Sequence, residues 1–552
     1  MKLIECVPNF SEGRDRSVID ALAEAIKSVE GVQLLEVDSG ADANRSVFTF
    51  VGPPEQVAEA AFRAIAVARE RIDMRRHQGA HPRLGACDVC PLVPLRGVDM
   101  AECVKLARAL GRRVAEELGI PVYLYAEAAG RPERRALDDV RRGEYESLAQ
   151  RLSDPFWEPD FGRLAGCERT GATIIGARNF LIAVNFNLNT DSRALAHDIA
   201  LEIREAGRVL KDSKGNMLRR RDGTPRRKPG RFRCVKAIGW TLPEKRLAQV
   251  SVNLTDFRVT PLAELFEEVC RQAEKRGARC TGTEIVGLVP LECLLEAGRY
   301  FAHKAGKSPG LPEERLLEIA SRSLGLSDLE PFDPHRRIIE YRLEEKRPLV
   351  EASLRGFVDE LSSDSPAPGG GSAAAACGAL AAALCAMVGN LTFGKKAYHK
   401  TWPQMAELAQ AAQQIKETLL RAVDDDTRAF SAVMAAMKLK GQGPTVEEEK
   451  MRALEGALAV PLEVLRQIKQ LLPLIKKALC EGNRQAVSDA AVAAACAHAA
   501  AWGAWYNVLI NLGQLAPERA AGKRREAEKL FQVIKPGLKE LEDLAAKNLE
   551  RG

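Results

Sequence analysis

The sequence predicts an α+β region followed by an all-α region. Before the run Pro366-Ala367-Pro368-Gly369-Gly370-Gly371-Ser372, segments with strand-like alternation of apolar residues are interspersed with segments that have helical spacing. After this run no convincing strand follows. The run itself contains glycines without a side chain to pack and prolines that restrict the backbone. It is either a flexible linker or a backbone cradle for an anion, because a long helix opens at Ser372.

The α+β region contains the same order of elements twice. In the first unit we expect strands at 3–7, 32–37, 46–52 and 89–94 and helices at 14–29 and 55–69, extended by a helix at 100–118 and a strand at 122–126. In the second we expect strands at 180–188, 235–240, 248–254 and 284–289 and helices at 192–206 and 262–276. The order β-α-β-β-α-β is that of a ferredoxin-like fold. The sequence thus predicts two such lobes, 1–178 and 179–335, with a cleft between their sheets as a ligand site.

The remainder predicts a bundle of long helices over 351–552. Helical patterns occur at 373–390, 405–438, 448–480, 488–512 and 517–549. A helix and a connection are expected over 311–345, and 336–350 is predicted to be the linker, because Lys346-Arg347-Pro348 breaks the pattern. The stretches 373–388 and 490–512 imitate membrane spans, but the first is mostly alanine and the second contains His498 and Asn507. Packed helices fit both better, so no membrane is expected.

Composition indicates a soluble protein of two to four domains. The chain has 552 residues, of which 46% are hydrophobic and 28% charged. Lys and Arg number 81 and Asp and Glu 75, a net charge of +6 that argues against a general nucleic-acid binder. The chain begins with a strand and shows no signal peptide, and its 13 scattered cysteines suit reduced thiols. We therefore expect a cytoplasmic protein.

One segment departs from this balance. Positions 208–233 hold eleven Lys or Arg and two acidic residues, together with several glycines and prolines. The pattern predicts an exposed basic hairpin or mobile loop in the second unit. A solvated insertion is the favoured interpretation, and an RNA contact is the alternative.

Candidate chemistry in the first unit centres on the segment 77–91. It contains His77, His81, an arginine and a carboxylate, and a histidine on a Pro-flanked loop suits proton transfer, although a structural histidine fits the spacing too. Cys87-x-x-Cys90 has no second such pair, so ordinary buried thiols are favoured over a zinc or redox site. Polar clusters at 8–13 and 38–40 follow two strands, where they are either functional or ordinary turns.

In the bundle, three adjacent aspartates at 424–426 lie within a helical pattern. They fan out around a helix, so one or two could face inward and have a raised pKa, whereas a solvated face is the simpler interpretation. Gly482-Asn483 and Ser488-Asp489 form a helix break and a cap. Lys395, Lys396 and Tyr398 follow the first long helix and could bind an anion.

Taken together, these motifs resemble one family. The runs Glu5-Cys6-Val7-Pro8-Asn9-Phe10-Ser11-Glu12-Gly13, 44–52, His81-Pro82-Arg83, 121–125 and 286–290 resemble glutamate formimidoyltransferase. The runs 367–372, 423–430, Gly482-Asn483, Ser488-Asp489 and 506–512 resemble formimidoyltetrahydrofolate cyclodeaminase. Their order is similar to that of the bifunctional formimidoyltransferase-cyclodeaminases, over nearly the whole chain.

The resemblance implies two reactions. A formimino group passes from N-formimino-L-glutamate to N5 of tetrahydrofolate, and 5-formiminotetrahydrofolate then closes to 5,10-methenyltetrahydrofolate and releases ammonia. The matching positions imply His81 and Asp38 as catalytic residues of the transferase and Asp426 as that of the cyclodeaminase. A histidine that titrates near neutrality would protonate the departing glutamate nitrogen, while Asp38 would orient it or bind the amidine. Ring closure is intramolecular, so one buried carboxyl could move the remaining protons.

The resemblance also implies the binding residues. Transferase substrate ligands are expected at Asn9, Glu12, Arg45 and Arg83. Cyclodeaminase ligands are expected at Gly369, Gly370, Gly371, Ser372, Lys395, Asn483 and Asp489. The folate-binding segment corresponds to Gly162-Arg163-Leu164-Ala165-Gly166-Cys167-Glu168-Arg169-Thr170-Gly171, whose interior is polar and charged here instead of rich in Pro, Ser and aromatic residues.

The expected co-substrate is tetrahydrofolate with a polyglutamate tail, for which the basic insertion at 208–233 is a candidate binding segment. No metal and no nucleotide are expected. The expected assembly is a homo-oligomer of dimers forming an octamer. Three alternatives stay open: only one active half, formylglutamate as the donor, or a non-catalytic folate- or RNA-binding scaffold.

Overall fold

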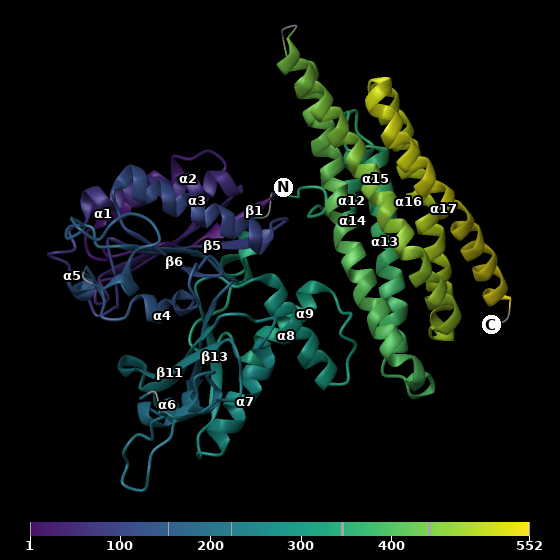
Figure 1. The fold of residues 1–552 in the computed structure, drawn as a ribbon. Helices are drawn as coiled ribbons and strands as arrows, with labels where there is room; N and C mark the ends of the chain where they lie inside the picture. The colour runs from purple at the N-terminus through teal and green to yellow at the C-terminus, as the bar shows by residue number, and fades with distance from the viewer. Residues whose placement is uncertain (1, 153, 222, 344–346, 440–442, 551–552) are drawn as a thin grey trace.

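The computed structural model describes residues 2–152, 154–221, 223–343, 347–439 and 443–550. It contains a mixed α/β region in two lobes and a helical region beside them (Figure 1). The order of predicted strands and helices is confirmed in both regions. Lys346, where the sequence pattern breaks, lies outside the described residues.

The first lobe is built on one sheet. Its strands are β1 (Leu3–Cys6), β2 (Asn9–Phe10), β3 (Gln33–Gly40), β4 (Arg45–Gly52), β5 (Cys87–Arg96), β6 (Val122–Ala126) and β7 (Thr173–Ala177). Strand β3 pairs with β4, and β4 pairs with both β1 and β2, which in turn pair with β5. Strand β7 lies between β5 and β6 and is parallel to both. Strand β7 is absent from the sequence prediction.

Alternation along the strands separates the two faces of this sheet. The helices α1 (Arg16–Lys27), α2 (Pro54–Arg71) and α3 (Met100–Leu118) cover one face, where Ile4 and Cys6 join their core. The opposite face is partly covered by 132–167, which includes α4 (Leu137–Val140) and α5 (Leu148–Arg151). The rest of that face looks toward the second lobe, because Val51 and Val93 share its core.

The second lobe is a smaller antiparallel sheet. It is built from β8 (Ile182–Leu188), α6 (Arg193–Ile203), β11 (Val235–Leu242), β12 (Leu247–Leu254), α7 (Leu262–Glu274) and β13 (Cys280–Val286), with the strand order β11-β12-β8-β13. Helices α8 (Leu291–Lys304), α9 (Glu313–Leu324), α10 (Pro334–Arg337) and α11 (Ile339–Arg342) follow. Helix α8 is a further element absent from the prediction.

The basic insertion has a defined backbone. Strands β9 (Arg208–Val209) and β10 (Arg227–Lys228) pair at its base, and it projects from the second lobe (Figure 1). Beyond them the chain makes two tight turns, closed by hydrogen bonds from Asp212 N to Asn216 O (2.9 Å) and from Arg220 N to Thr224 O (2.8 Å). Of the two predicted forms, the hairpin is therefore the one observed.

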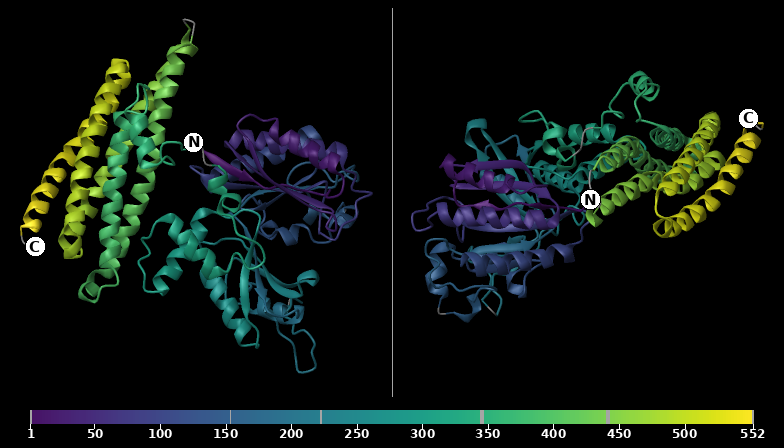
Figure 2. Two further views of the ribbon diagram at one scale, coloured as in Figure 1. Left: turned by 180° about the vertical axis from the view of Figure 1, so that it is seen from behind. Right: turned by 90° about the horizontal axis from the view of Figure 1, so that it is seen from above.

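The helical region consists of long antiparallel helices. They are α13 (Gly370–Thr392), α14 (Trp402–Met437), α15 (Pro444–Glu481), α16 (Val487–Gln514) and α17 (Pro517–Leu549), as Figure 2 shows from two sides, and the short helix α12 (Leu354–Leu361) precedes them. Helix α13 begins at Gly370, two residues before the predicted start at Ser372. By length and composition alone α13 could cross a membrane, but most of its apolar window is buried inside the protein.

A loop of the second lobe joins it to the helices. Ser308, Pro309 and Gly310, between α8 and α9, are buried against the bundle. The Gly310 carbonyl accepts hydrogen bonds from Asn390 Nδ2 (2.9 Å) and Gln413 Nε2 (3.1 Å). A Cβ at Gly310 would lie 2.3 Å from Ala409 Cβ, so only glycine allows α14 to approach this closely.

Candidate active sites

A cleft of about 580 Å³ lies between the open face of the first sheet and the second lobe. Because side chains alternate along a strand, the odd-numbered residues of several strands reach it together. The first lobe contributes Glu5, Val7, Asn9, Arg45, Val47, Thr49, Val89, Pro91 and Tyr125, and the second contributes Leu181, Ala183, Asn253, Glu284 and Val286. Arg141, Arg178 and Arg337 add positive charge, and Glu36 and Asp38 add negative charge. Such a lining suits a ligand that carries both carboxylates and a cationic group.

His81 is held at this cleft by two polar contacts. Its Nδ1 lies 2.7 Å from the Pro82 carbonyl, so Nδ1 carries the proton and Nε2 is the basic nitrogen. Nε2 lies 2.5 Å from Nη1 of Arg45. Burial, with Arg45 and then Arg141 adding positive charge, lowers the pKa of His81 to about 4. This pKa lies below the expected titration near neutrality, so His81 is neutral at neutral pH and its Nε2 can accept a proton.

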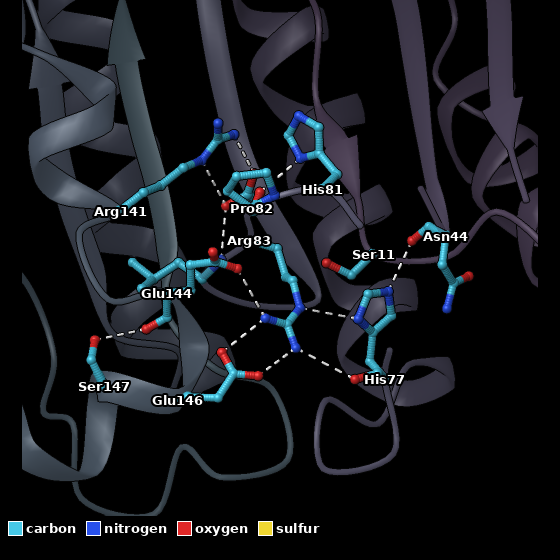
Figure 3. Close-up of polar contacts among 12 residues, drawn as sticks. Ser11, Asn44, His77, His81, Pro82, Arg83, Arg141, Glu144, Glu146 and Ser147 are labelled. Atoms are coloured by element: carbon cyan, nitrogen blue, oxygen red, sulfur yellow. Dashed lines mark hydrogen bonds and ion pairs between the residues drawn. The ribbon is translucent and has the colours of Figure 1, made fainter. Parts of the chain in front are cut away.

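Arg141 fixes the loop that carries His81. It pairs with Asp88, which is buried and also accepts a hydrogen bond from the Leu84 N–H at 2.9 Å. Figure 3 shows Arg141 and His81 on either side of Pro82. The ion pair between Arg141 and Asp88 thus stabilises the turn between 81 and 88, which carries His81.

Asp38 is exposed on β3 and lines the cleft. Within the described residues no hydrogen bond joins it to His81, which Pro82 and Arg45 orient instead. Asp38 thus makes no direct hydrogen bond within the described chain that would orient His81, and it lies at the cleft, where a ligand can reach it.

The four expected transferase ligands divide into two pairs. Asn9 and Arg45 line the cleft. Arg83 is buried outside the lining and contacts Glu146 (2.6 Å), Glu144 (3.2 Å) and His77 (3.2 Å), as Figure 3 shows. Glu12 accepts hydrogen bonds from the N–H groups of Arg14 (2.8 Å) and Asp15 (2.9 Å). Arg83 and Glu12 are thus held by other parts of the protein and do not line the cleft.

The segment 162–171 supports the same face of the sheet beside the cleft. Leu164 and Cys167 pack in a cluster with Val89 and Tyr123. Gly171 has φ +64°, and a Cβ there would lie 2.3 Å from the Leu84 carbonyl oxygen. None of the described cleft-lining residues belongs to 162–171. The segment 162–171 thus packs against Leu84, in the loop that follows His81.

A second acid–base site lies where α13 begins. Asp426 on α14 faces the glycine run: a Cβ at Gly371 would meet its Oδ1 at 2.2 Å, and the Ser372 hydroxyl lies 3.2 Å from its Oδ2. Burial raises the pKa of Asp426, and hydrogen bonds from Ser372 oppose that shift. Burial and the hydrogen bonds from Ser372 thus act in opposite directions on the pKa of this carboxyl, with burial the larger effect.

The neighbouring aspartates have other partners. Asp424 is buried and accepts hydrogen bonds from the N–H groups of Leu349 (3.1 Å) and Val350 (3.2 Å), so it fastens the incoming chain to the bundle. Asp425 pairs with Arg428 on the same helix. Among the three, Asp426 is the one beside the glycines.

The other expected bundle ligands gather at the far end of α13. Lys395 Nζ lies 3.2 Å from Gln485 Oε1, and the Asn483 N–H donates to Thr392 Oγ1 at 2.8 Å. Asp489 follows in the first turn of α16. Helix α13 spans 23 residues, or about 33 Å, so one subunit does not bring this group near Asp426.

Comparison with known proteins agrees with this two-part organisation. Family models described as "Formiminotransferase domain, N-terminal subdomain", "Formiminotransferase domain" and "Formiminotransferase-cyclodeaminase" match residues 3–178, 183–344 and 353–529. The chain is 45% identical over 531 residues to formimidoyltransferase-cyclodeaminase of Rattus norvegicus, with 95% of each chain covered. The chain belongs to the formimidoyltransferase-cyclodeaminase family.

Relatives of each half also exist as separate proteins. Glutamate formimidoyltransferase of Thermoplasma acidophilum is 44% identical over 324 residues, which cover 58% of this chain and 99% of that protein. Methenyltetrahydrofolate cyclohydrolase of Methylorubrum extorquens is 36% identical over 201 residues, which cover 35% of this chain and 89% of that protein.

The thiols of the first lobe are buried. Cys87 and Cys90 are both free and buried, and Cys90 Sγ lies 3.6 Å from Cys6 Sγ. Over the described ranges no group of three or more His, Cys, Asp and Glu is arranged to hold a metal ion. The interpretation of Cys87 and Cys90 as ordinary buried thiols fits this environment.

Sequence reasoning missed several cleft residues: Glu5, Tyr125, Arg141, Arg178 and Arg337. One signal was available for Glu5, which interrupts the apolar run Leu3-Ile4-Glu5-Cys6-Val7 of a central strand. The arginines lie outside the motifs and reach the cleft only through the folded chain.

Proposed function

We propose that this chain is a bifunctional folate enzyme that acts on N-formimino-L-glutamate and tetrahydrofolate. The α/β lobes transfer the formimino group to N5, and the helical region closes 5-formiminotetrahydrofolate to 5,10-methenyltetrahydrofolate with release of ammonia. The observation that carries the proposal is the presence of two separate acid–base groups, His81 in the cleft and Asp426 at the glycine run, in a chain that matches bifunctional relatives along 95% of its length.

The transferase step uses His81 as a proton carrier. N5 attacks the formimino carbon, and neutral His81 takes the N5 proton on Nε2 once Arg45 turns to a substrate carboxylate. The imidazolium then gives this proton to the glutamate nitrogen as its bond to carbon breaks. One proton moves from N5 to the leaving amine, and the side chain returns to its neutral form.

The cyclisation step uses Asp426 in a similar way. N10 attacks the formimino carbon, to which it is already tethered, so little positioning is needed. The Asp426 carboxylate takes the N10 proton and delivers it to the departing nitrogen, which leaves as ammonia. The bare backbone of Gly369, Gly370 and Gly371 admits the folate close to this carboxylate.

The substrates account for the other expected ligands. Tetrahydrofolate with a polyglutamate tail is the proposed co-substrate, the segment 162–171 is the proposed folate-binding segment, and Asn9, Arg45 and Asp38 are proposed to contact the donor. The proposed units are ferredoxin-like lobes at 1–178 and 179–335, a linker at 336–350 and the cyclodeaminase at 351–552, in a cytoplasmic protein.

We also propose a homo-oligomer in which two bundles pair through α13 and α16. The exposed apolar side chains of these helices support this: Leu380 is 58% and Ile510 66% exposed, and Leu391 and Tyr506 lie on the same two helices. Antiparallel pairing would place Lys395, Asn483 and Asp489 of one copy near Asp426 of the other. Further pairing through the lobes would build the octamer that the resemblance implies.

A coupled assay tests the proposed function. With N-formimino-L-glutamate and tetrahydrofolate, the wild type should produce methenyltetrahydrofolate and ammonia. His81→Ala should abolish transfer but still cyclise supplied 5-formiminotetrahydrofolate, and Asp426→Asn should transfer without cyclising. Loss of both activities in each folded variant would contradict two separate sites, and RNA binding without turnover would favour a scaffold.

A further inference from the structure

Glu5 is a buried carboxylate at the floor of the cleft. It is 2% exposed and lies in register between Val51 of β4 and Val93 of β5. Because its neighbours Ile4 and Cys6 join the core under α1–α3, Glu5 faces the opposite side, where it lines the cleft. In the described part of the chain no side chain or backbone group donates a hydrogen bond to its carboxylate. Buried polar groups normally form hydrogen bonds, and the Glu5 carboxylate has no donor among the described residues. A ligand in the cleft could supply that donor.

The charges around Glu5 compensate it only in part. Arg178, in the loop after β7, faces it as the opposing cation, and Glu340 on α11 adds negative charge. Arg178 also donates from Nη1 to the Asn179 carbonyl at 2.9 Å. Burial raises the pKa of Glu5 to about 7, and Arg178 counters this shift. A second cation entering the cleft would therefore be drawn to this position.

The other carboxylates of the cleft have partners or face water. Glu284 accepts hydrogen bonds from Asn185 (3.1 Å) and Gln249 (2.9 Å). Glu36 forms an ion pair with Arg337 at 3.9 Å, and Asp38 is exposed. Glu5 is thus the buried acidic group of the cleft that is available to a ligand.

We propose that the Glu5 carboxylate binds the cationic amidine of the donor and thereby selects formimino over formyl donors. The inference rests on the proposed transferase function. The amidinium presents two N–H groups along one edge, which match the two oxygens of a carboxylate as in a bidentate arginine pair. The formyl group instead presents a carbonyl oxygen, which would face a carboxylate oxygen and be repelled.

The position of Glu5 relative to the other polar residues fits this role. Asn9 lies on the same face of the adjoining strand β2, and Arg45 lies on β4, which pairs with both strands. An amidine held at Glu5 would lie in the cleft that His81 also lines, with the arginines left to receive the donor carboxylates. Glu5 would then bind and orient the reacting group, while His81 moves the proton.

The experiment compares the binding of two donors of matched shape by calorimetry, using the full-length protein at pH 8. N-formimino-L-glutamate should bind the wild type about 10- to 100-fold more tightly than N-formyl-L-glutamate. Glu5→Gln, which keeps the shape and removes the charge, should abolish that preference and change formyl binding little. Glu5→Asp, which keeps the charge on a shorter side chain, should retain part of it. Glu24→Gln, which removes a carboxylate on α1 outside the cleft, is the control and should leave the preference intact.

The pH dependence gives a second measurement. Protonation of Glu5 removes the negative charge, so formimino affinity of the wild type should decline as the pH falls through about 7, whereas formyl affinity should not. Glu5→Gln should lack this decline. An unchanged donor preference in Glu5→Gln, or an equal loss for both donors, would overturn the inference.

Transfer assays with the same proteins separate the two conclusions. If the wild type transfers from formiminoglutamate and Glu5→Gln keeps the same donor ratio in kcat/KM, the amidine site is wrong and the transferase stands. If the wild type transfers from neither donor but its formimino-binding preference disappears in Glu5→Gln, the binding site stands and the transferase assignment fails.

Discussion

The backbone of Gly371 lies directly against the carboxylate of Asp426, where a Cβ atom would meet Oδ1 at 2.2 Å. No rotation of an alanine methyl group relieves such a contact, so either the helix or the carboxylate must move. We predict that Gly371→Ala lowers kcat for cyclodeamination at least about 100-fold, because displacement by about 1 Å is enough for a loss of that size. Formimino transfer, measured separately in the same variant, should be unchanged.

Two neighbouring glycines provide matched controls. A Cβ at Gly370 would make an ordinary contact with Asn507 Nδ2 at 3.5 Å, and one at Gly369 would meet nothing within 4 Å. Both alanine variants should therefore cyclise far better than Gly371→Ala. Equal activity in all three variants would mean that the carboxylate does not need this backbone.

Ser372 should influence the pH at which cyclodeaminase activity declines on the acid side of its pH profile. Its hydrogen bonds favour the ionised form of Asp426 and oppose the upward shift that burial causes in the pKa of this carboxyl. In Ser372→Ala the pKa of Asp426 should rise further, so activity should begin to decline at a higher pH than in the wild type. A pH profile of kcat/KM for supplied 5-formiminotetrahydrofolate measures this shift; a shift toward lower pH would refute the assignment of Asp426 as the base.

Arg45 should hold the pKa of His81 below its ordinary value. Burial is the main cause of that lowering, and Arg45 is the first of the two arginines that add to it. Arg45→Gln should therefore move the pKa of His81 upward from about 4 without restoring it completely. Titration of the His81 ring protons by NMR measures this directly, and Lys2→Gln, remote from the cleft, should leave the titration curve unchanged.

The exposed face of α13 and α16 should be required for assembly and for cyclodeamination. Leu380→Glu together with Ile510→Glu should convert a paired bundle into separate subunits, as measured by light scattering, and reduce cyclodeamination more than transfer. Val533→Glu on α17, where the side chain is 54% exposed, should leave the assembly intact. Full cyclodeaminase activity in a separated Leu380→Glu, Ile510→Glu protein would show that one subunit holds a complete site.

Periodicity along the chain was enough to predict the order of elements. The spacing of Ile19, Leu22 and Ile26 predicts α1, and these side chains are buried on one face of that helix. Long apolar repeats likewise predict the helices of the bundle. Strand β7 was missed because it follows a long irregular segment and pairs in parallel with strands distant in sequence.

The candidate site could be predicted only in part, because a motif does not reveal what surrounds each residue. Arg83 stands two residues after His81, yet it is buried against Glu146 and Glu144, which lie more than 60 positions away. The low pKa of His81 likewise depends on burial and then on Arg45 and Arg141, which come from other elements. Asn483 and Asp426 belong to motifs of one half, but only the length of α13 reveals their separation.

Gly310 is in buried contact with Asn390, Gln413 and the backbone near Ala409, and this contact fixes the second lobe against the helical region. Two domains on a flexible tether present their sites to each other at an effective concentration set by tether length. Here a folded contact outside the tether sets the spacing, so lengthening the connection after Arg342 should barely alter it. The spacing between the cleft and Asp426 within one subunit is therefore set by the contact of Gly310 with Asn390 and Gln413.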